Sequence, residues 1–182
     1  MSASEKSLNK TRDLTKMALM IAINCISAYL IIPLPWSLSP LALQTVIVTL
    51  TGFILKPKHA AITMSVYILI GLAGIPVFTG GTAGPGKLFG PTGGYIFGFI
   101  LAATAISYLK PREYNFLKYA WVGLIGIPLI YIPGVIQLMA LTKMDFLKAF
   151  MVGAVTFIPL DIVQVGIASY LAGPLLKVFE SR

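Results

Sequence analysis

The side chains of this sequence that could do chemistry are a few polar residues inside otherwise apolar segments. Asp161 is the only acidic residue well inside such a segment, and Gln164 lies three residues further on, so a helix would present both on one face. An ionisable group at such a position costs about 2.5–3.5 kcal/mol and generally faces a cavity or a partner. The pair therefore predicts a hydrogen-bonding site for a polar ligand. The alternative is that a neighbouring Tyr or Thr holds Asp161 as a contact between helices.

Three further polar residues lie near the ends of apolar segments. Gln44 begins the second segment, Tyr95 begins the fourth, and Gln137 lies toward the end of the fifth. Each of them alone is more typical of helix packing than of ligand binding. Together with Asp161 and with Thr82 in a neighbouring loop, they would form a polar set at one end of a helix bundle, where ligand sites between helices are expected.

The stretch 76–95, PVFTGGTAGPGKLFGPTGGY, is rich in glycine and proline. Glycine lets the backbone approach a ligand closely, and proline fixes φ and removes a donor, so the stretch predicts a shaped, non-helical loop that caps a binding site. Part of it has the glycine spacing of a nucleotide-binding P-loop. However, Leu88 stands where that motif needs Ser or Thr, and Pro85 removes an amide from the phosphate cradle. The sequence therefore argues against nucleotide binding by this chain.

Catalytic and metal chemistry have little support in the residue types. The single histidine, His59, has no partner at metal-ligand spacing, and without a histidine inside the apolar segments there is no nucleophile–base set. The single cysteine, Cys25, lies in an apolar run and cannot form a disulfide within the chain. We expect no enzyme activity, no metal site and no cofactor.

The composition is that of a membrane protein. Hydrophobic residues make up 57% of the 182 residues and charged residues only 11%, and the mean hydropathy is +0.88. So few charges cannot cover the surface of a soluble domain. The net charge of +8 does not indicate nucleic-acid binding, because the basic residues are scattered at segment ends rather than gathered on one face with aromatic residues.

Six apolar segments follow one another along the chain. Proline-containing stretches end the first two, and several segments approach the ~20 residues needed to cross a membrane. No strand-like alternation competes with them. The sequence predicts an all-α, polytopic membrane protein, with residues 1–182 as a single domain and six transmembrane helices at about 14–34, 41–55, 59–75, 93–109, 119–141 and 146–178.

Most lysine and arginine residues lie at the segment ends on the same side as the N-terminus. The positive-inside rule then places both termini in the cytoplasm, and we expect the protein to lie in the plasma membrane. Residues 1–13 become a polar cytoplasmic tail, and the loop 76–95 faces outward. On the first segment, Ala18 and Ala22 form a small-xxx-small pair, which lets another helix approach closely. Their spacing fits docking of a partner protein and packing within the bundle equally well.

The glycine loop, from Gly74-Ile-Pro-Val-Phe-Thr-Gly-Gly to Gly90-Pro-Thr-Gly-Gly-Tyr95, resembles the signature loop of the BioY family, the biotin-binding S components of energy-coupling factor (ECF) transporters. The resemblance covers nearly the whole chain. It also includes Ala18 and Ala22, Gln44, and Pro159-Leu-Asp161. It implies a six-helix membrane subunit that captures biotin outside and releases it inside when docked to a transmembrane coupling (T) subunit and two ATPase subunits. ATP would be bound by those ATPases and not by this chain.

Carried over residue by residue, the resemblance places Gln44, Thr82, Tyr95 and Asp161 at biotin contacts and Ala18 and Ala22 at the T-subunit surface. Two positions depart from the family pattern, which has a lysine where this chain has Gln164 and a tryptophan where it has Gln137. Asp161 and Gln164 would then bind the ureido ring, the amides of the loop and Lys87 the carboxylate, and Tyr95 and Phe78 the apolar parts. A biotin precursor or another small carboxylated vitamin stays open as the substrate.

A function of a different class also fits the buried carboxylate. The chain could be a proton-coupled secondary carrier for a small carboxylated vitamin, working alone, with Asp161 as the proton site. The lack of an obvious internal two-fold repeat argues against it.

Overall fold

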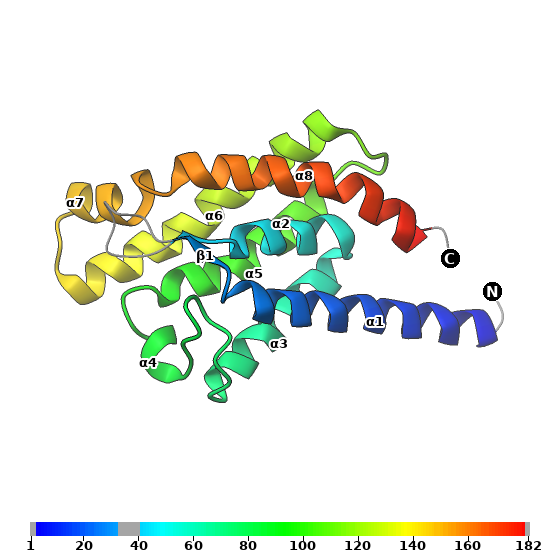
Figure 1. Cartoon of the computed structure of the whole chain (residues 1–182), viewed down its shortest axis with the longest axis horizontal. Helices are drawn as coiled ribbons and strands as arrows, with labels where there is room; N and C mark the ends of the chain where they lie inside the picture. Colours follow the sequence, from blue (N-terminus) through cyan, green and yellow to red (C-terminus); the bar gives the residue numbers. More distant parts are fainter. Residues whose placement is uncertain (1–2, 33–40, 181–182) are drawn as a thin grey trace.

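The protein is a bundle of helices that run along one long axis (Figure 1). The computed structural model describes residues 3–32 and 41–180. The main helices are α1 (Ala3–Ser27), α2 (Gln44–Ile54), α3 (Pro57–Leu72), α5 (Gly93–Leu109), α6 (Phe116–Thr142) and α8 (Ile158–Glu180). Shorter elements are β1 (Ile31–Ile32), β2 (Leu41–Ala42), α4 (Pro85–Leu88), α7 (Phe146–Phe150) and the π-helix η1 (Met151–Val155).

The first helix differs from the prediction at both ends. α1 begins at Ala3, inside the predicted polar tail, and ends at Ser27, before the proline-rich stop expected after it. Its last residues lead into β1, which pairs antiparallel with β2, so a short two-stranded ribbon adds to the predicted helices. The prolines 33 and 35, which were expected to end the helix, lie outside the described residues.

The loop and the last segment are also more structured than predicted. Pro85 occupies the first turn of α4, a helical turn inside the loop that was expected to be non-helical, because proline fits the start of a helix. The last segment is not one helix but α7, η1 and α8, and its break falls at Thr156 and Phe157. Pro159 therefore lies in the first turn of α8 rather than at a kink inside a longer helix.

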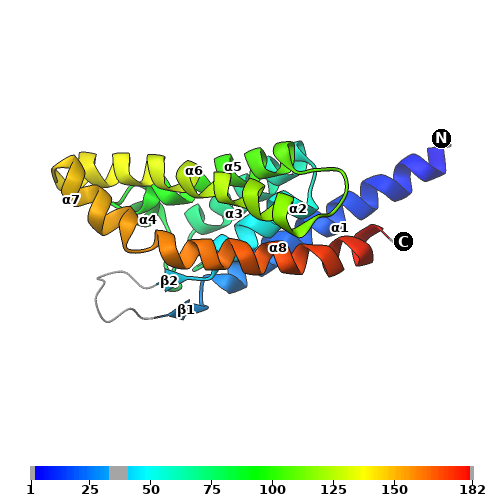
Figure 2. The same ribbon diagram turned by 90° about the horizontal axis from the view of Figure 1, so that it is seen from above.

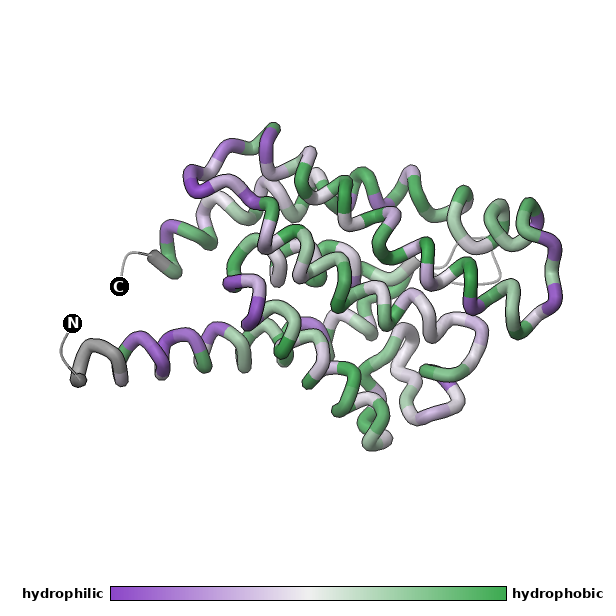
Figure 3. Tube along the Cα trace, turned by 180° about the vertical axis from the view of Figure 1, so that it is seen from behind, coloured by the Kyte–Doolittle hydropathy of each residue, from purple (hydrophilic) through white to green (hydrophobic). Residues whose placement is uncertain are grey.

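The surface is that of a membrane protein. Of the described residues, two helical stretches are long and apolar enough to cross a membrane, Phe116–Thr142 and Phe146–Phe179, and only 33% and 28% of their most apolar windows are buried. A soluble core helix would be mostly buried, so these apolar side chains face outward. Hydrophilic stretches gather at the ends of the bundle and the middle is mainly hydrophobic (Figure 3). α2 has only 11 residues, too few to cross alone, so the six-span topology stays a prediction.

The two ends of the bundle are different. The first and last helices come together at one end, where the guanidinium of Arg12 donates to the carbonyl of Phe179. The loop that contains α4 lies away from the termini, on the same side as α7 (Figures 1 and 2). Between the ends, α5 packs tightly on α6, because a Cβ at Gly98 would lie 2.7 Å from the Cα of Ile130. Glycine at this position brings α5 close enough to α6 for the two helices to form one wall.

Candidate ligand-binding pocket

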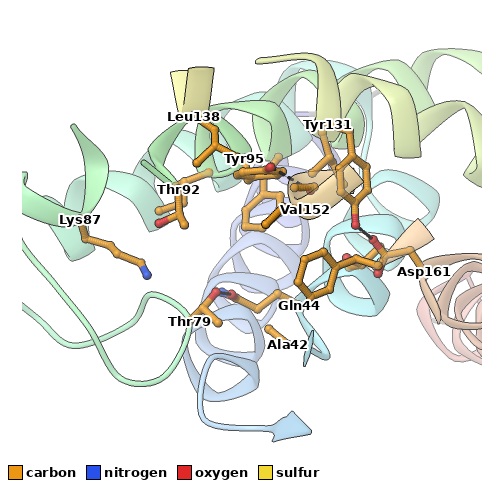
Figure 4. Close-up of a pocket in the computed structure, with 16 residues that line it drawn as sticks. Ala42, Gln44, Thr79, Lys87, Thr92, Tyr95, Tyr131, Leu138, Val152 and Asp161 are labelled. Atoms are coloured by element: carbon orange, nitrogen blue, oxygen red, sulfur yellow. Dashed lines mark hydrogen bonds between the residues drawn. The ribbon is translucent and has the colours of Figure 1, made fainter. Parts of the chain in front are cut away.

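A cavity of about 210 Å³ lies between α2, α5, α6, the η1–α8 junction and the glycine loop. A single water molecule needs only about 10–15 Å³ of such space, so the cavity has room for a compact small molecule. Its walls are apolar where they are formed by Phe99, Ile130, Leu138 and Phe157. Its polar lining residues are Gln44, Thr45, Thr79, Lys87, Thr92, Tyr95, Tyr131 and Asp161 (Figure 4).

Asp161 forms the acceptor at one side of the pocket. It lies in the first turn of α8 and is 3% exposed. The hydroxyl of Tyr131 donates to its Oδ2 at 2.6 Å, and the amide of Gln164 donates to its Oδ1 at 2.9 Å. The positive end of the α8 dipole further favours the carboxylate. Asp161 therefore forms a contact between α6 and α8 and also lines the cavity. Its predicted role in binding a polar ligand stays a prediction.

Gln164 supports Asp161 and is not among the residues that line the cavity. The backbone N–H of Val46 donates to Gln164 Oε1 at 3.3 Å. Because a backbone N–H can only donate, this bond places the carbonyl of the amide toward α2 and its NH₂ group toward Asp161. Gln164 consequently holds the carboxylate in a fixed orientation.

Tyr95 is held in place by Gly134 on α6 and by Gly153 in η1. Its hydroxyl donates to the carbonyl of Gly153, in η1, at 2.8 Å. Its ring meets that of Tyr131 edge-on, with the centroids 5.7 Å apart. A Cβ at Gly134 would lie 2.4 Å from the Tyr95 ring, so only glycine leaves room for it there. The tyrosine thus connects α5 to the π-helix at the edge of the pocket, and π-helices are frequent at functional sites.

Lys87 extends from α4 toward the Gln44 side of the pocket (Figure 4). Among the described residues that line the cavity, Lys87 is the one with a cationic side chain. Burial lowers the pKa of Lys87, because it disfavours the charged ammonium. An anionic group in the cavity would favour the charged ammonium again. Asp161 lies on the opposite side of the cavity from Lys87 (Figure 4).

The first half of the loop is folded around a glycine turn. Phe78 and Thr82 exchange backbone hydrogen bonds of 2.9 and 3.1 Å. Gly80 and Gly81 lie between them with φ values of +76° and +69°, a conformation that favours glycine. The N–H of Gly80 also donates to the carbonyl of Ala28 at the end of α1. The loop therefore has a fixed shape and is joined to the bundle.

Three predicted site residues contact this loop but lie outside the cavity lining: Thr82 and Phe78 in the loop itself, and Gln137 on α6. The hydroxyl of Thr82 donates to the carbonyl of Thr79 at 3.1 Å. Phe78 is 0% exposed and packs edge-on against Tyr67, with the ring centroids 5.8 Å apart. Gln137 donates to the carbonyls of Leu88 and Gly90 at 3.1 and 2.7 Å. These contacts hold the loop, and the predicted roles in ligand binding stay predictions.

The residues that the sequence reasoning missed are the pocket lining groups Tyr131, Thr79, Thr45 and Thr92. Tyr131 lies between Pro128 and Pro133 in the fifth segment. A tyrosine in an apolar segment is a weak signal, because tyrosines are also common at membrane interfaces. Threonine side chains that bond back to their own helix are equally common, so the pattern could not single these residues out.

The alanine pair of α1 lies on the surface. Ala18 and Ala22 are both exposed, together with Leu19 and Ile26 on the same helix. The pair therefore does not pack inside the bundle, which was one of the two interpretations of its spacing. Docking of a partner protein on this face stays a prediction.

The chain matches known proteins over nearly its whole length. A family model described as the BioY family matches residues 1–181. The biotin transporter BioY of Thermotoga maritima is 35% identical over 171 residues, which cover 94% of this chain and 99% of that protein. The biotin transporter BioY2 of Lactococcus lactis is 32% identical over 172 residues, with 94% and 93% covered. A crystal structure of the S-component for biotin from an ECF-type ABC transporter superposes with a TM-score of 0.85 and 26% identity, covering 97% of this chain and 95% of that one.

Proposed function

The chain belongs to the BioY family, and from this we propose that it captures biotin outside the cell as the substrate-binding subunit of an ATP-driven uptake system. Biotin would occupy the cavity between α2, α5, α6 and the glycine loop. ATP would be bound by partner ATPases. Relatives named as biotin transporters support this assignment, and the chemistry of the cavity agrees with it.

The observation that carries the proposal is the arrangement of polar groups around an apolar cavity. Biotin has a ureido ring with two N–H donors, an apolar chain and a carboxylate. Asp161, held by Tyr131 and Gln164, offers acceptor oxygens to the ring N–H groups. Lys87 offers a positive charge to the carboxylate, and Phe99 and Leu138 provide apolar surface between them. One molecule with donors at one end and an anion at the other would satisfy both sides of the site.

The test is the affinity of the purified protein for biotin in detergent, measured by calorimetry. Asp161→Asn replaces one acceptor oxygen by a donor, so we expect the dissociation constant to rise at least tenfold, which is about 1.4 kcal/mol. Glu113→Gln, which removes an exposed carboxylate outside the cavity, serves as the control and should bind as the wild type does. A folded wild-type protein without measurable biotin binding would refute the proposal, and an unaltered Asp161→Asn affinity would leave Asp161 as a helix contact only.

Delivery of biotin to the cytoplasm needs a second interaction. We propose that the exposed face of α1 around Ala18 and Ala22 docks on the transmembrane coupling subunit, with both termini in the cytoplasm. The small side chains allow a partner helix to approach closely. The termini lie together at one end of the bundle, and the glycine loop lies away from them. This arrangement agrees with a loop that receives biotin outside while the cytoplasmic end meets the ATPases.

A further inference from the structure

Tyr67, on α3, connects the glycine loop to the pocket without lining it. Its side chain is 1% exposed and is absent from the cavity wall. Its hydroxyl donates to the carbonyl of Val77 in the loop at 2.8 Å. The same hydroxyl accepts from the amide Nε2 of Gln44, at the start of α2. One buried oxygen atom therefore joins three segments of the chain.

The direction of these bonds fixes the orientation of the Gln44 amide. The carbonyl of Val77 can only accept, so the proton of Tyr67 is used there and the hydroxyl must accept from Gln44. The NH₂ group of Gln44 consequently faces Tyr67, and its Oε1 faces the loop. There Oε1 accepts the hydroxyl proton of Thr79 at 2.6 Å. The oxygens of Gln44 and Thr79 are left as an acceptor surface on the pocket wall (Figure 4).

The same tyrosine supports the loop by packing. Phe78 lies edge-on to the Tyr67 ring and fills a space above Gly71, where a Cβ would lie 2.1 Å from the Phe78 ring. The N–H of Gly84 donates to the Gly71 carbonyl at 2.8 Å. The side of α3 that carries Tyr67 thus holds the loop at Val77, Phe78 and Gly84.

We propose that Tyr67 is a positioning residue for ligand capture: its hydroxyl holds the Gln44 amide and the Val77 carbonyl in one arrangement, and thereby sets the acceptor surface that Gln44 and Thr79 present to the ligand. The inference rests on the proposed biotin site. For the ligand, this means that the oxygens of Gln44 and Thr79 can accept hydrogen bonds from its N–H groups. Without the hydroxyl, the Gln44 amide can rotate and the loop loses one of its attachments.

The first test needs no ligand. Tyr67→Phe keeps the ring and its packing on Phe78 and removes only the hydroxyl. We expect hydrogen–deuterium exchange of the amides of residues 77–84 to be faster by about tenfold, the equivalent of one lost hydrogen bond. Tyr114→Phe is the control, because that hydroxyl donates to the Ser169 carbonyl away from the loop. Unchanged exchange in the loop of a folded Tyr67→Phe protein would overturn the proposal, whatever the ligand is.

The second test is a double-mutant cycle for biotin affinity. Tyr67→Phe should raise the dissociation constant about tenfold, whereas Tyr114→Phe should leave it within about twofold. If Tyr67 acts through Gln44, the effect of Tyr67→Phe should largely disappear in a Gln44→Leu background. An equal loss in both backgrounds would make Tyr67 a purely structural residue and refute the positioning role. If the wild type does not bind biotin but the loop exchange still responds, the biotin assignment fails while the role of Tyr67 in holding the loop stands.

Discussion

At the scale of single residues, the orientations of three glutamine side chains are set by backbone groups that can only donate or only accept, directly or through a hydroxyl whose proton is already used. The N–H of Val46 orients Gln164, the hydroxyl of Tyr67 orients Gln44, and two carbonyls orient Gln137. Of the three, Gln44 lines the pocket and Gln164 holds the lining residue Asp161, so these two parts of the pocket wall have a fixed polarity before any ligand enters. Pre-organised polar groups lower the cost of binding, because fewer side chains must be ordered.

Lys87 gives the site a pH dependence. Burial lowers its pKa, so the charge that would attract the carboxylate is present below that pKa and is lost as the pH rises through it. We expect biotin affinity to fall on the alkaline side at a lower pH than an ordinary lysine would give. In Lys87→Arg, whose guanidinium stays charged, the fall should disappear, and in Lys87→Gln affinity should be about tenfold weaker than that of the wild type below the Lys87 pKa and equal to it well above that pKa. Calorimetry across a pH series measures this, and an alkaline fall that persists in Lys87→Arg would assign the titration to another group.

At the scale of the elements, α2 depends on a neighbour for its C-terminal end. The ammonium of Lys110 donates to the carbonyls of Gly52, Phe53 and Leu55 at 3.3, 2.6 and 2.7 Å. The last carbonyls of a helix have no partner within it, and a cation there also interacts favourably with the helix dipole. Since Gln44 begins the same short helix, this contact helps to fix the helix that carries a pocket residue.

Replacing Lys110 by methionine removes the side-chain donor from the carbonyls of Gly52 and Phe53, whereas the carbonyl of Leu55 keeps the hydroxyl of Ser107 as a donor. We expect Lys110→Met to lower the free energy of unfolding by about 1–3 kcal/mol, which is the cost of unsatisfied polar groups. Thermal unfolding in detergent measures the loss as a lower melting temperature. Lys118→Met, which removes an exposed lysine near the start of α6, is the matched control. A melting temperature as little affected as in the control would mean that water satisfies the carbonyls of α2.

The sequence predicted the elements better than the details of the site. Apolar runs and their boundaries place α2, α3, α5 and α6 close to their observed positions, because each run must be helical to satisfy its backbone in an apolar medium. The π-helix η1, the break after it and the turn α4 were missed, since all three depend on local packing rather than on periodicity. Gln44, Lys87, Tyr95 and Asp161 were predicted and lie around one cavity, whereas Tyr67 and Tyr131 act through partners distant in sequence. Only the fold reveals such pairings.

At the scale of the whole molecule, α1 reaches both of the surfaces that transport would use. Its C-terminal half carries the exposed alanines, and Ala28, the residue that follows the helix, accepts a hydrogen bond from the N–H of Gly80 in the glycine loop. The hydroxyl of Tyr29, just after α1, donates to the carbonyl of Pro76 at 2.6 Å. A subunit that docks on α1 therefore meets a helix that is followed directly by two residues, Ala28 and Tyr29, bonded to the loop over the pocket.

The exposed alanines of α1 make docking separable from binding. Substituting leucine at Ala18 and Ala22 should abolish co-purification with the coupling and ATPase subunits and ATP-dependent biotin uptake in vesicles, because the bulky side chains keep the partner helix away. Biotin affinity of the isolated chain should stay within about twofold of the wild type, because neither alanine lines the cavity. Ala140→Leu, at an exposed alanine of α6, controls for added bulk on the surface. Intact co-purification would refute the docking face, and uptake by this chain alone that an uncoupler abolishes would favour the proton-coupled carrier instead.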